Sequence, residues 1–207
     1  MFNSIKNKLL KRRLNHSIKK ADKIRIKDIE SIKNTWSKLN KLQIYNYDEL
    51  YNTCLYSSIV YNDISVLYDF YINTNNHYHA NLYGRLLSMT IYEYLQDINK
   101  LLGKNLRQEL EKNNLIEFVN ELKIINKEYA SIKNENQKFL KNIRVNSAAH
   151  KSKDSKYLVE IISENHSKEL NKLALRTSEI TNKLIQLTSK IISKITKDLT
   201  VKFEVTK

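Results

Sequence analysis

The near absence of chain-breaking residues is the feature that most constrains the fold of this chain. Its 207 residues include no proline and only two glycines, Gly84 and Gly103. Strands joined by tight turns usually need more of both, because these residues supply the backbone angles that such turns require. Long helices need neither. The sequence therefore predicts an all-α fold, and with 41% hydrophobic residues it can bury a core of ordinary domain size.

Apolar residues recur every three or four positions, which is the spacing of an amphipathic helix. The helices that this spacing predicts cover about residues 1–40, a tyrosine-rich stretch capped by Asp48, 78–102 with Gly103 as C-cap, 114–143 and 155–199. Tyrosines at helical spacing are expected in the core or at an interface, with base stacking as the alternative. In the last helix, Leu170, Leu173, Ile180, Leu184, Leu187, Ile191 and Ile195 form a heptad-like seam.

Short polar loops between long helices predict antiparallel neighbours in a bundle. We expect two parts: residues 1–45 as a basic helical extension packed on the bundle, and residues 46–207 as the helical domain. The net charge of +14 and the pI of about 9.6 favour a polyanionic partner such as RNA, DNA or an anionic membrane face. The basic helix over residues 1–40 is interpreted as a packed helix with a solvated cationic face, with RNA contact or membrane contact as alternatives.

Several protein classes are excluded or disfavoured by what the sequence lacks. Cys54 is the only cysteine, so an intrachain disulfide and a cysteine-cluster metal site are excluded. No apolar run approaches the roughly 20 residues that span a bilayer, and lysines and arginines interrupt the apolar N-terminal residues where a secretory signal would be unbroken. A glycine-rich phosphate loop is also missing. The expectation is a cytoplasmic protein without a cofactor.

The residues that can carry chemistry follow the predicted end of a helix at Ile143. They read Arg144-Val145-Asn146-Ser147-Ala148-Ala149-His150. Arg144 and His150 are separated by two helical turns at most and can converge on one phosphate. Histidine exchanges a proton near neutral pH, and a guanidinium matches the oxygens on which charge builds. The pair suits metal-free RNA cleavage, in which the 2′-OH attacks the adjacent phosphate. A homodimer would supply the second histidine that the leaving oxygen requires.

This segment resembles the motif of the HEPN superfamily, which has an arginine, four to six intervening residues and a histidine at the end of a helix in an α-helical bundle. The resemblance extends over about residues 78–199, and the helical context is similar to that of abortive-infection-type members. It implies a metal-independent endoribonuclease that acts as a dimer with both motifs facing one cleft. Such an enzyme would be a toxin or antiphage-defence effector, with an antitoxin or another defence-system partner. Some members carry a tyrosine two residues after the histidine, where this chain has Ser152.

In this interpretation His150 is the general base or acid, Arg144 stabilises the phosphate charge and Asn146 orients both. Three lysines near the motif would attract the RNA backbone: Lys141, Lys151 and Lys153. Glu93 and Asp97, one turn apart, are predicted either to support the motif, to bind a metal or to form a solvated face.

Four alternatives stay open. Arg144 and His150 could simply close a helix by binding its last carbonyls. His77 and His79, with Asp69 nearby, could ligate a metal. The chain could be a non-catalytic helical RNA-binding or assembly subunit. The basic N-terminal helix could also contact a membrane, although we do not favour that interpretation.

Overall fold

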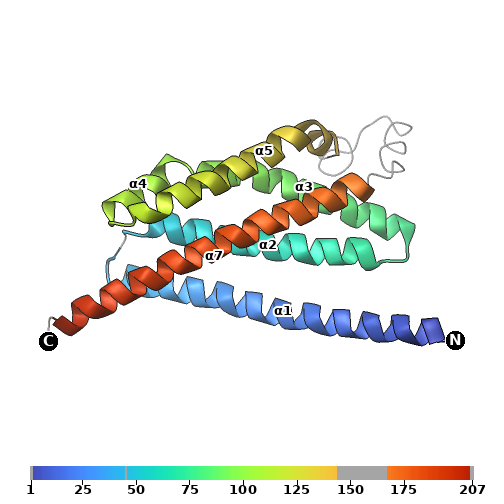
Figure 1. Ribbon diagram of the computed structural model, residues 1–207, viewed down its shortest axis with the longest axis horizontal. Coiled ribbons are helices and arrows are strands. Elements are labelled where there is room, and N and C mark those ends of the chain that lie inside the picture. The colour runs from blue at the N-terminus through green and yellow to red at the C-terminus, as the bar shows by residue number, and fades with distance from the viewer. Residues whose placement is uncertain (1, 45, 144–166, 206–207) are drawn as a thin grey trace. The chain divides into compact units, whose positions relative to one another are not determined.

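The structure, a computed structural model, describes residues 2–44, 46–143 and 167–205, and all the regular structure in them is helical. The elements are α1 (Phe2–Lys41), α2 (Asp48–Asn73), α3 (His77–Leu101), α4 (Lys104–Lys112), the 3₁₀ helix η1 (Ile116–Phe118), α5 (Val119–Ile143) and α7 (Ser167–Val205) (Figure 1). The predicted all-α class is confirmed. The chain divides into two compact units, Met1–Ile44 and Tyr45–Lys207, which are described separately.

Helices α2, α3, α5 and α7 form an antiparallel four-helix bundle, as predicted. Tyr56 in the first half of α2 packs against Tyr94 in the second half of α3, whereas Phe70 near the end of α2 stacks on Tyr83 near the start of α3. Three ion pairs show that α5, with the preceding η1, runs antiparallel to α7, because the partner's number falls as the number in α5 rises: Glu117–Lys194, Glu128–Lys183 and Glu135–Arg176. Helix α7 also packs on α2, so the four helices close into a ring (Figure 1).

The apolar seam of α7 lies in the centre of this ring. All seven leucine and isoleucine positions predicted for the seam are buried: Leu170, Leu173, Ile180, Leu184, Leu187, Ile191 and Ile195. They recur in steps of three, four and once seven, so one face of α7 contacts the other three helices along most of its length. This confirms the predicted register of the longest helix of the bundle.

A line of hydroxyl groups crosses the same core. The Tyr129 hydroxyl donates to Thr181 Oγ1 at 2.9 Å, and Thr181 Oγ1 donates to the Thr177 carbonyl at 2.7 Å. The Tyr94 hydroxyl lies 2.9 Å from the Tyr129 hydroxyl. Since each hydroxyl has one proton, the Tyr94 hydroxyl must be the donor to Tyr129. The rings of Tyr94 and Tyr129 also meet edge to face, with centroids 5.6 Å apart. Polar groups from α3, α5 and α7 are therefore satisfied by one another inside the core.

Helix α4 and its role are not predicted by the sequence. The prediction of Asp48 as the N-cap of α2 is wrong, because Asp48 is the first helical residue. The N-cap residue is Tyr47, whose side chain accepts no capping hydrogen bond. The cap is instead the carboxylate of Glu109 on α4, which accepts the backbone N–H groups of Glu49 and Leu50, each at 2.8 Å. A carboxylate at this position satisfies two free N–H groups and complements the helix dipole. Helix α4 thus fixes the start of α2.

Gly103 occupies the junction between α3 and α4. Its N–H donates to the Lys100 carbonyl at 2.9 Å. The predicted C-cap role of Gly103 is wrong, because the C-cap residue of α3 is Leu102 and Gly103 is the N-cap residue of α4. A Cβ atom at this position would lie 2.5 Å from the Lys100 carbonyl oxygen. Glycine is required here because of space, not because of an unusual backbone angle.

Replacing Glu109 by alanine is expected to destabilise the protein by about 1–2 kcal/mol, because two backbone N–H groups at the start of α2 lose their acceptor. The matched control is Glu111→Ala, which removes an exposed carboxylate from the same helix. Urea unfolding followed by circular dichroism measures both. Equal effects of the two substitutions would contradict the capping role.

Candidate functional site

The predicted catalytic residues Arg144, Asn146 and His150, with Lys151 and Lys153, lie outside the described residues. The described helices nevertheless define where this segment is attached. Helix α5 ends at Ile143 and α7 begins at Ser167, and because these helices are antiparallel, both attachment points lie at one end of the bundle. The turn between α2 and α3, at residues 74–76, lies at the same end (Figure 1). We call this end of the bundle the motif end.

The bundle stays tightly packed up to the motif end. Leu140 and Ile143 of α5 are 1% and 6% exposed, and Leu170 in the first turn of α7 is 4% exposed. Gly84 on α3 allows a close approach there, since a Cβ atom on it would lie 3.0 Å from the Tyr71 ring and 3.4 Å from Leu170. The residue that immediately precedes Arg144 is therefore held in the core.

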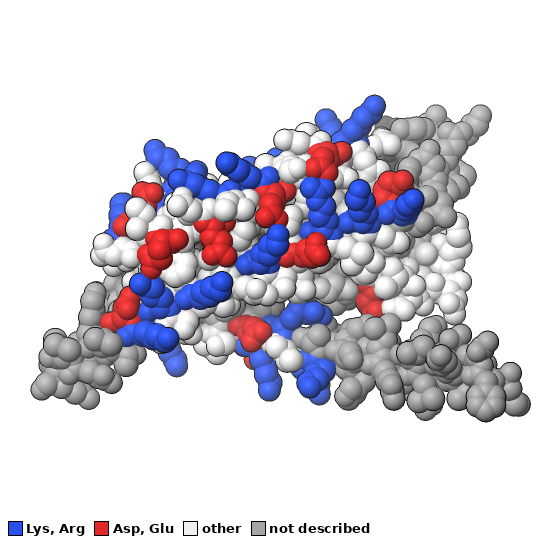
Figure 2. Space-filling model, viewed as in Figure 1, with Lys and Arg blue, Asp and Glu red and all other residues white. Residues whose placement is uncertain are grey.

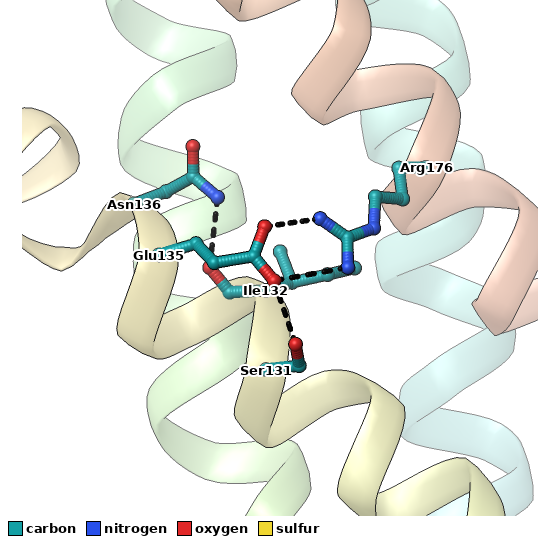
Figure 3. A network of polar contacts seen from close by, with 5 residues as sticks. All are labelled: Ser131, Ile132, Glu135, Asn136 and Arg176. Carbon is teal, nitrogen blue, oxygen red and sulfur yellow. Dashed lines mark hydrogen bonds and ion pairs between the residues drawn. The ribbon is translucent and has the colours of Figure 1, made fainter.

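An ion pair links α5 to α7 close to the motif end (Figure 3). Arg176 donates through both terminal guanidinium nitrogens to the Glu135 carboxylate, with Nη2 to Oε1 at 3.1 Å. The Ser131 hydroxyl donates to the same Oε1 at 2.6 Å, and on the neighbouring turn Asn136 Nδ2 donates to the Ile132 carbonyl at 2.9 Å. The hydrogen bonds from Arg176 and Ser131 lower the pKa of Glu135 to about 2. A forked pair of this kind fixes orientation as well as distance between the two helices.

The sequence contains a signal for this pairing that motif reasoning missed. Glu128 and Glu135 are seven residues apart on α5, and Arg176 and Lys183 are seven apart on α7. Opposite charges repeated every seven residues on two antiparallel helices predict an interhelical ladder. In the structure Glu128 pairs with Lys183 and Glu135 with Arg176. The ladder orients the two helices that carry the ends of the segment 144–166.

The stability contributed by the Glu135–Arg176 pair is expected to be lost in acid. The pKa of Glu135 is about 2 in the folded protein against an ordinary value of 4.5, so the contribution is complete above about pH 4.5 and disappears as the pH falls towards 2. Glu135→Gln should lower the unfolding temperature by no more than about 4 °C at pH 6, since the pair is partly exposed. The difference from wild type should shrink as the pH falls below 4.5 and be lost only below about pH 2. A constant difference across this range would contradict the assignment, and exposed Glu179→Gln is the control.

Glu93 and Asp97 lie on α3 near the middle of the bundle. Asp97 accepts from the Tyr56 hydroxyl at 3.5 Å and from Lys100 at 3.2 Å. Burial, reinforced by the Asp97 charge, raises the pKa of Tyr56 to about 12. Glu93 and Asp97 lie at the same height along the bundle as Tyr94 and Tyr129. Tyr129 precedes Ile143 by 14 residues, which corresponds to about 21 Å along α5. The support of the motif by Glu93 and Asp97 stays a prediction, because their described contacts belong to the bundle centre.

Four predicted residues lie at the motif end: Asp69 near the end of α2, His77, His79 and Lys141. Asp69 accepts from Asn73 Nδ2 at 2.5 Å. Lys141 is exposed in the last turn of α5, where a cation also favours the helix dipole. His77 and His79 are exposed in the first turn of α3. The backbone N–H of His79 donates to Asn76 Oδ1 at 3.1 Å, and His77 Nδ1 lies 3.4 Å from Asn81 Nδ2. No group of three or more metal-ligating side chains occurs among the described residues.

A polar pocket lies at the opposite end of the bundle, between the start of α2 and α4. Its lining residues are Asn46, Glu49, Asn105, Gln108, Glu109, Lys112 and Asn113. Glu109 already accepts two backbone N–H groups there, and Asn113 Nδ2 donates to the Asn46 carbonyl at 2.8 Å. The pocket therefore consists largely of groups that join α4 to α2, and it is separate from the motif end.

The chain finds no match among models of protein families, curated proteins or solved structures. Across residues 2–44, 46–143 and 167–205, no helix combines the length and the apolar content that a bilayer crossing requires. The fold thus defines an antiparallel helical bundle with a separate basic helix. The HEPN resemblance stays a prediction from the sequence.

Proposed function

We propose that the chain is a metal-independent endoribonuclease whose catalytic residues are Arg144 and His150. The observation that supports this most is the position of the motif directly after Ile143, a core residue at the end of a long bundle helix. Asn146 would orient the reacting groups. Lys141, Lys151 and Lys153 would attract the RNA backbone.

The proposed reaction needs two proton transfers. A neutral His150 takes the proton of the 2′-OH, whose oxygen attacks the adjacent phosphorus. The bond to the 5′-oxygen breaks, and that oxygen takes a proton from a second, protonated histidine. The products are a 2′,3′-cyclic phosphate and a 5′-OH. Arg144 stabilises the charge that develops on the phosphorane oxygens.

The second histidine is supplied by a second copy of the chain, so the proposed enzyme is a homodimer with a composite active site. From the HEPN resemblance, the enzyme would be a toxin or an antiphage-defence effector held in check by an antitoxin or another defence partner. A cytoplasmic location follows from the same proposal, because the substrate is cellular RNA.

The test is incubation of the purified protein with RNA in EDTA. The expected result is cleavage that leaves 2′,3′-cyclic phosphate ends and is unaffected by the chelator. Failure of a folded, dimeric preparation to cut RNA in EDTA, or cleavage only after a divalent metal is added, would overturn the proposal.

A non-catalytic RNA-binding or assembly subunit is the second candidate. It is favoured by the division of the chain into a bundle and a separate basic helix, α1. It predicts salt-sensitive RNA binding without cleavage, and a binding that does not depend on His150.

A further inference from the structure

The positive charge of the chain is concentrated in its first unit. Residues 1–44 contain 13 of the 36 lysines and arginines but only 3 of the 22 aspartates and glutamates, which gives them a net +10 of the total +14. Residues 45–207 hold the remaining +4. On the bundle, cations are interleaved with carboxylates, as Figure 2 shows, and several are paired, including Lys183 with Glu128 and Lys194 with Glu117. Most of the excess positive charge therefore lies in residues 1–44.

Five exposed lysines of α1 share one side of the helix: Lys20, Lys23, Lys27, Lys38 and Lys41. Their spacings of three, four, eleven and three residues keep them within an arc of about 60°. No ion pair is recorded for any of the five in the part of the chain that the structure describes. We call this row the lysine stripe. Its first and last residues, Lys20 and Lys41, are 21 positions apart, or about 32 Å of helix.

The opposite side of α1 carries half-buried apolar residues, with Arg25 among them. Ile29, Ile32 and Trp36 follow one another at three- and four-residue spacing, about half a turn away from the lysine stripe. The two sides have different partners, since an apolar face is buried against nonpolar groups and an uncompensated row of cations attracts anions.

We propose that the lysine stripe is a docking surface for the phosphate backbone of RNA. Two clusters of ammonium groups on one side of a helix, separated by eleven residues and about 32 Å long in all, match a linear polyanion better than a single phosphate. Lysines are point charges without the fork that reads a base edge, so the stripe contacts the backbone and does not select a sequence. The choice of RNA as the polyanion rests on the proposed function. Binding of a phosphate backbone by the stripe does not depend on cleavage.

A membrane surface fits the same helix less well. A helix that lies in a bilayer interface buries its apolar side, here that of Ile29, Ile32 and Trp36. The lysine stripe would then point away from the lipid phosphates by about a helix diameter, roughly 10 Å, which is also about one Debye length at 0.1 M salt. Electrostatic attraction to lipid headgroups would be largely screened, whereas a nucleic acid can approach the stripe directly.

The test measures binding of a labelled single-stranded RNA of about 20 nucleotides by fluorescence anisotropy between 50 and 200 mM salt. The full chain carries His150→Ala throughout, so that the RNA is not consumed. The stripe variant is Lys20→Gln with Lys23→Gln and Lys27→Gln. The matched control is Lys123→Gln with Lys127→Gln and Lys138→Gln, which removes the same charge from exposed positions of α5.

The stripe variant is expected to bind about tenfold more weakly, and the slope of log K against log salt should fall in magnitude by about 2, since three backbone contacts are lost. The control should bind almost as the parent does. Arginine at the same three positions should restore binding, which separates loss of charge from loss of folding. The proposal would be overturned if the stripe and control variants lost RNA affinity equally. It would also be overturned if a stripe variant with the same helix content as its parent bound RNA unchanged.

Vesicles of equal parts phosphatidylserine and phosphatidylcholine provide the second arm. The lysine stripe should contribute little to vesicle binding. Vesicle binding that the stripe substitutions abolish, with RNA binding intact, would overturn the RNA assignment in favour of a membrane. All binding is measured with His150→Ala, so the binding result does not depend on cleavage. If the stripe binds RNA but the wild-type protein does not cut it, the proposed enzymatic activity is contradicted and the proposed docking surface is not.

Discussion

A folded His150→Ala protein is expected to lose RNA cleavage by at least two orders of magnitude. In the proposed reaction His150 carries both proton transfers, one from each copy of the dimer, and a general acid or base contributes about 10²–10⁴-fold. Alanine removes the imidazole from both copies at once. Cleavage rates at saturating RNA, measured in EDTA, give the ratio to wild type.

The matched control is His79→Ala, which makes the same change at an exposed histidine of α3. This control should cleave at the wild-type rate, because His79 takes part in no step of the proposed reaction. The two variants should share the helix content and oligomeric state of wild type. A similar loss in both, or a wild-type rate in the His150→Ala protein, would contradict the role of His150.

Truncation of Tyr129 is expected to have the largest effect on stability. Tyr129→Ala should cost about 3–5 kcal/mol, because a fully buried ring that contacts Tyr94 is lost and a cavity is left in the centre of the bundle. Tyr129→Phe keeps the ring but leaves the Tyr94 hydroxyl without its acceptor and Thr181 without its donor. It should cost about 1–3 kcal/mol. Urea unfolding measures both values.

The hydrogen bond between the two tyrosines can be separated from packing by a double-mutant cycle. Tyr94→Phe combined with Tyr129→Phe should destabilise by less than the sum of the single changes, because removing both partners leaves no unsatisfied hydroxyl between them. Tyr78→Phe is the control, since Tyr78 is 65% exposed and the change should stay within about 0.5 kcal/mol. Strict additivity of the two core substitutions would contradict the hydroxyl line.

Much of the bundle follows from the sequence because it depends on local spacing. The predicted helix over 78–102 is α3, His77–Leu101, and the leucines and isoleucines expected in the α7 seam are all buried. Helical periodicity needs no knowledge of distant residues, and the absence of proline leaves few interior positions where a helix must break. The antiparallel order of α2 and α3 follows from their short connection at residues 74–76.

The features that the sequence leaves unpredicted depend on contacts between distant positions. Glu109 caps α2 from about 60 residues away, and the short helix α4 that carries it lies where a loop between two predicted helices was expected. The pairing of Tyr129 with Tyr94 and Thr181 joins three helices. No local pattern of hydrophobicity specifies which buried hydroxyls meet, because that depends on the register between helices.

For the candidate site, the sequence predicts the catalytic residues, and the structure shows where the segment that carries them joins the bundle. The spacing of Arg144 and His150 is visible in the sequence alone. The core position of Ile143 and the Glu135–Arg176 pair that joins α5 to α7 become apparent only in the packed bundle. The concentration of charge in residues 1–44 could have been counted from the sequence, but its interpretation as a stripe separate from the bundle needs the division into two units.

The most direct measurement of the central claim compares wild type and His150→Ala on two substrates in EDTA. One substrate is an RNA with a mapped cleavage site, and the other is the same RNA with a single 2′-deoxy nucleotide at that site. Wild type should cut the first substrate there, leave a 2′,3′-cyclic phosphate and spare the second, and His150→Ala should leave both intact. Cleavage of the deoxy site by wild type, or undiminished cleavage of the RNA by a folded His150→Ala protein, would contradict the account.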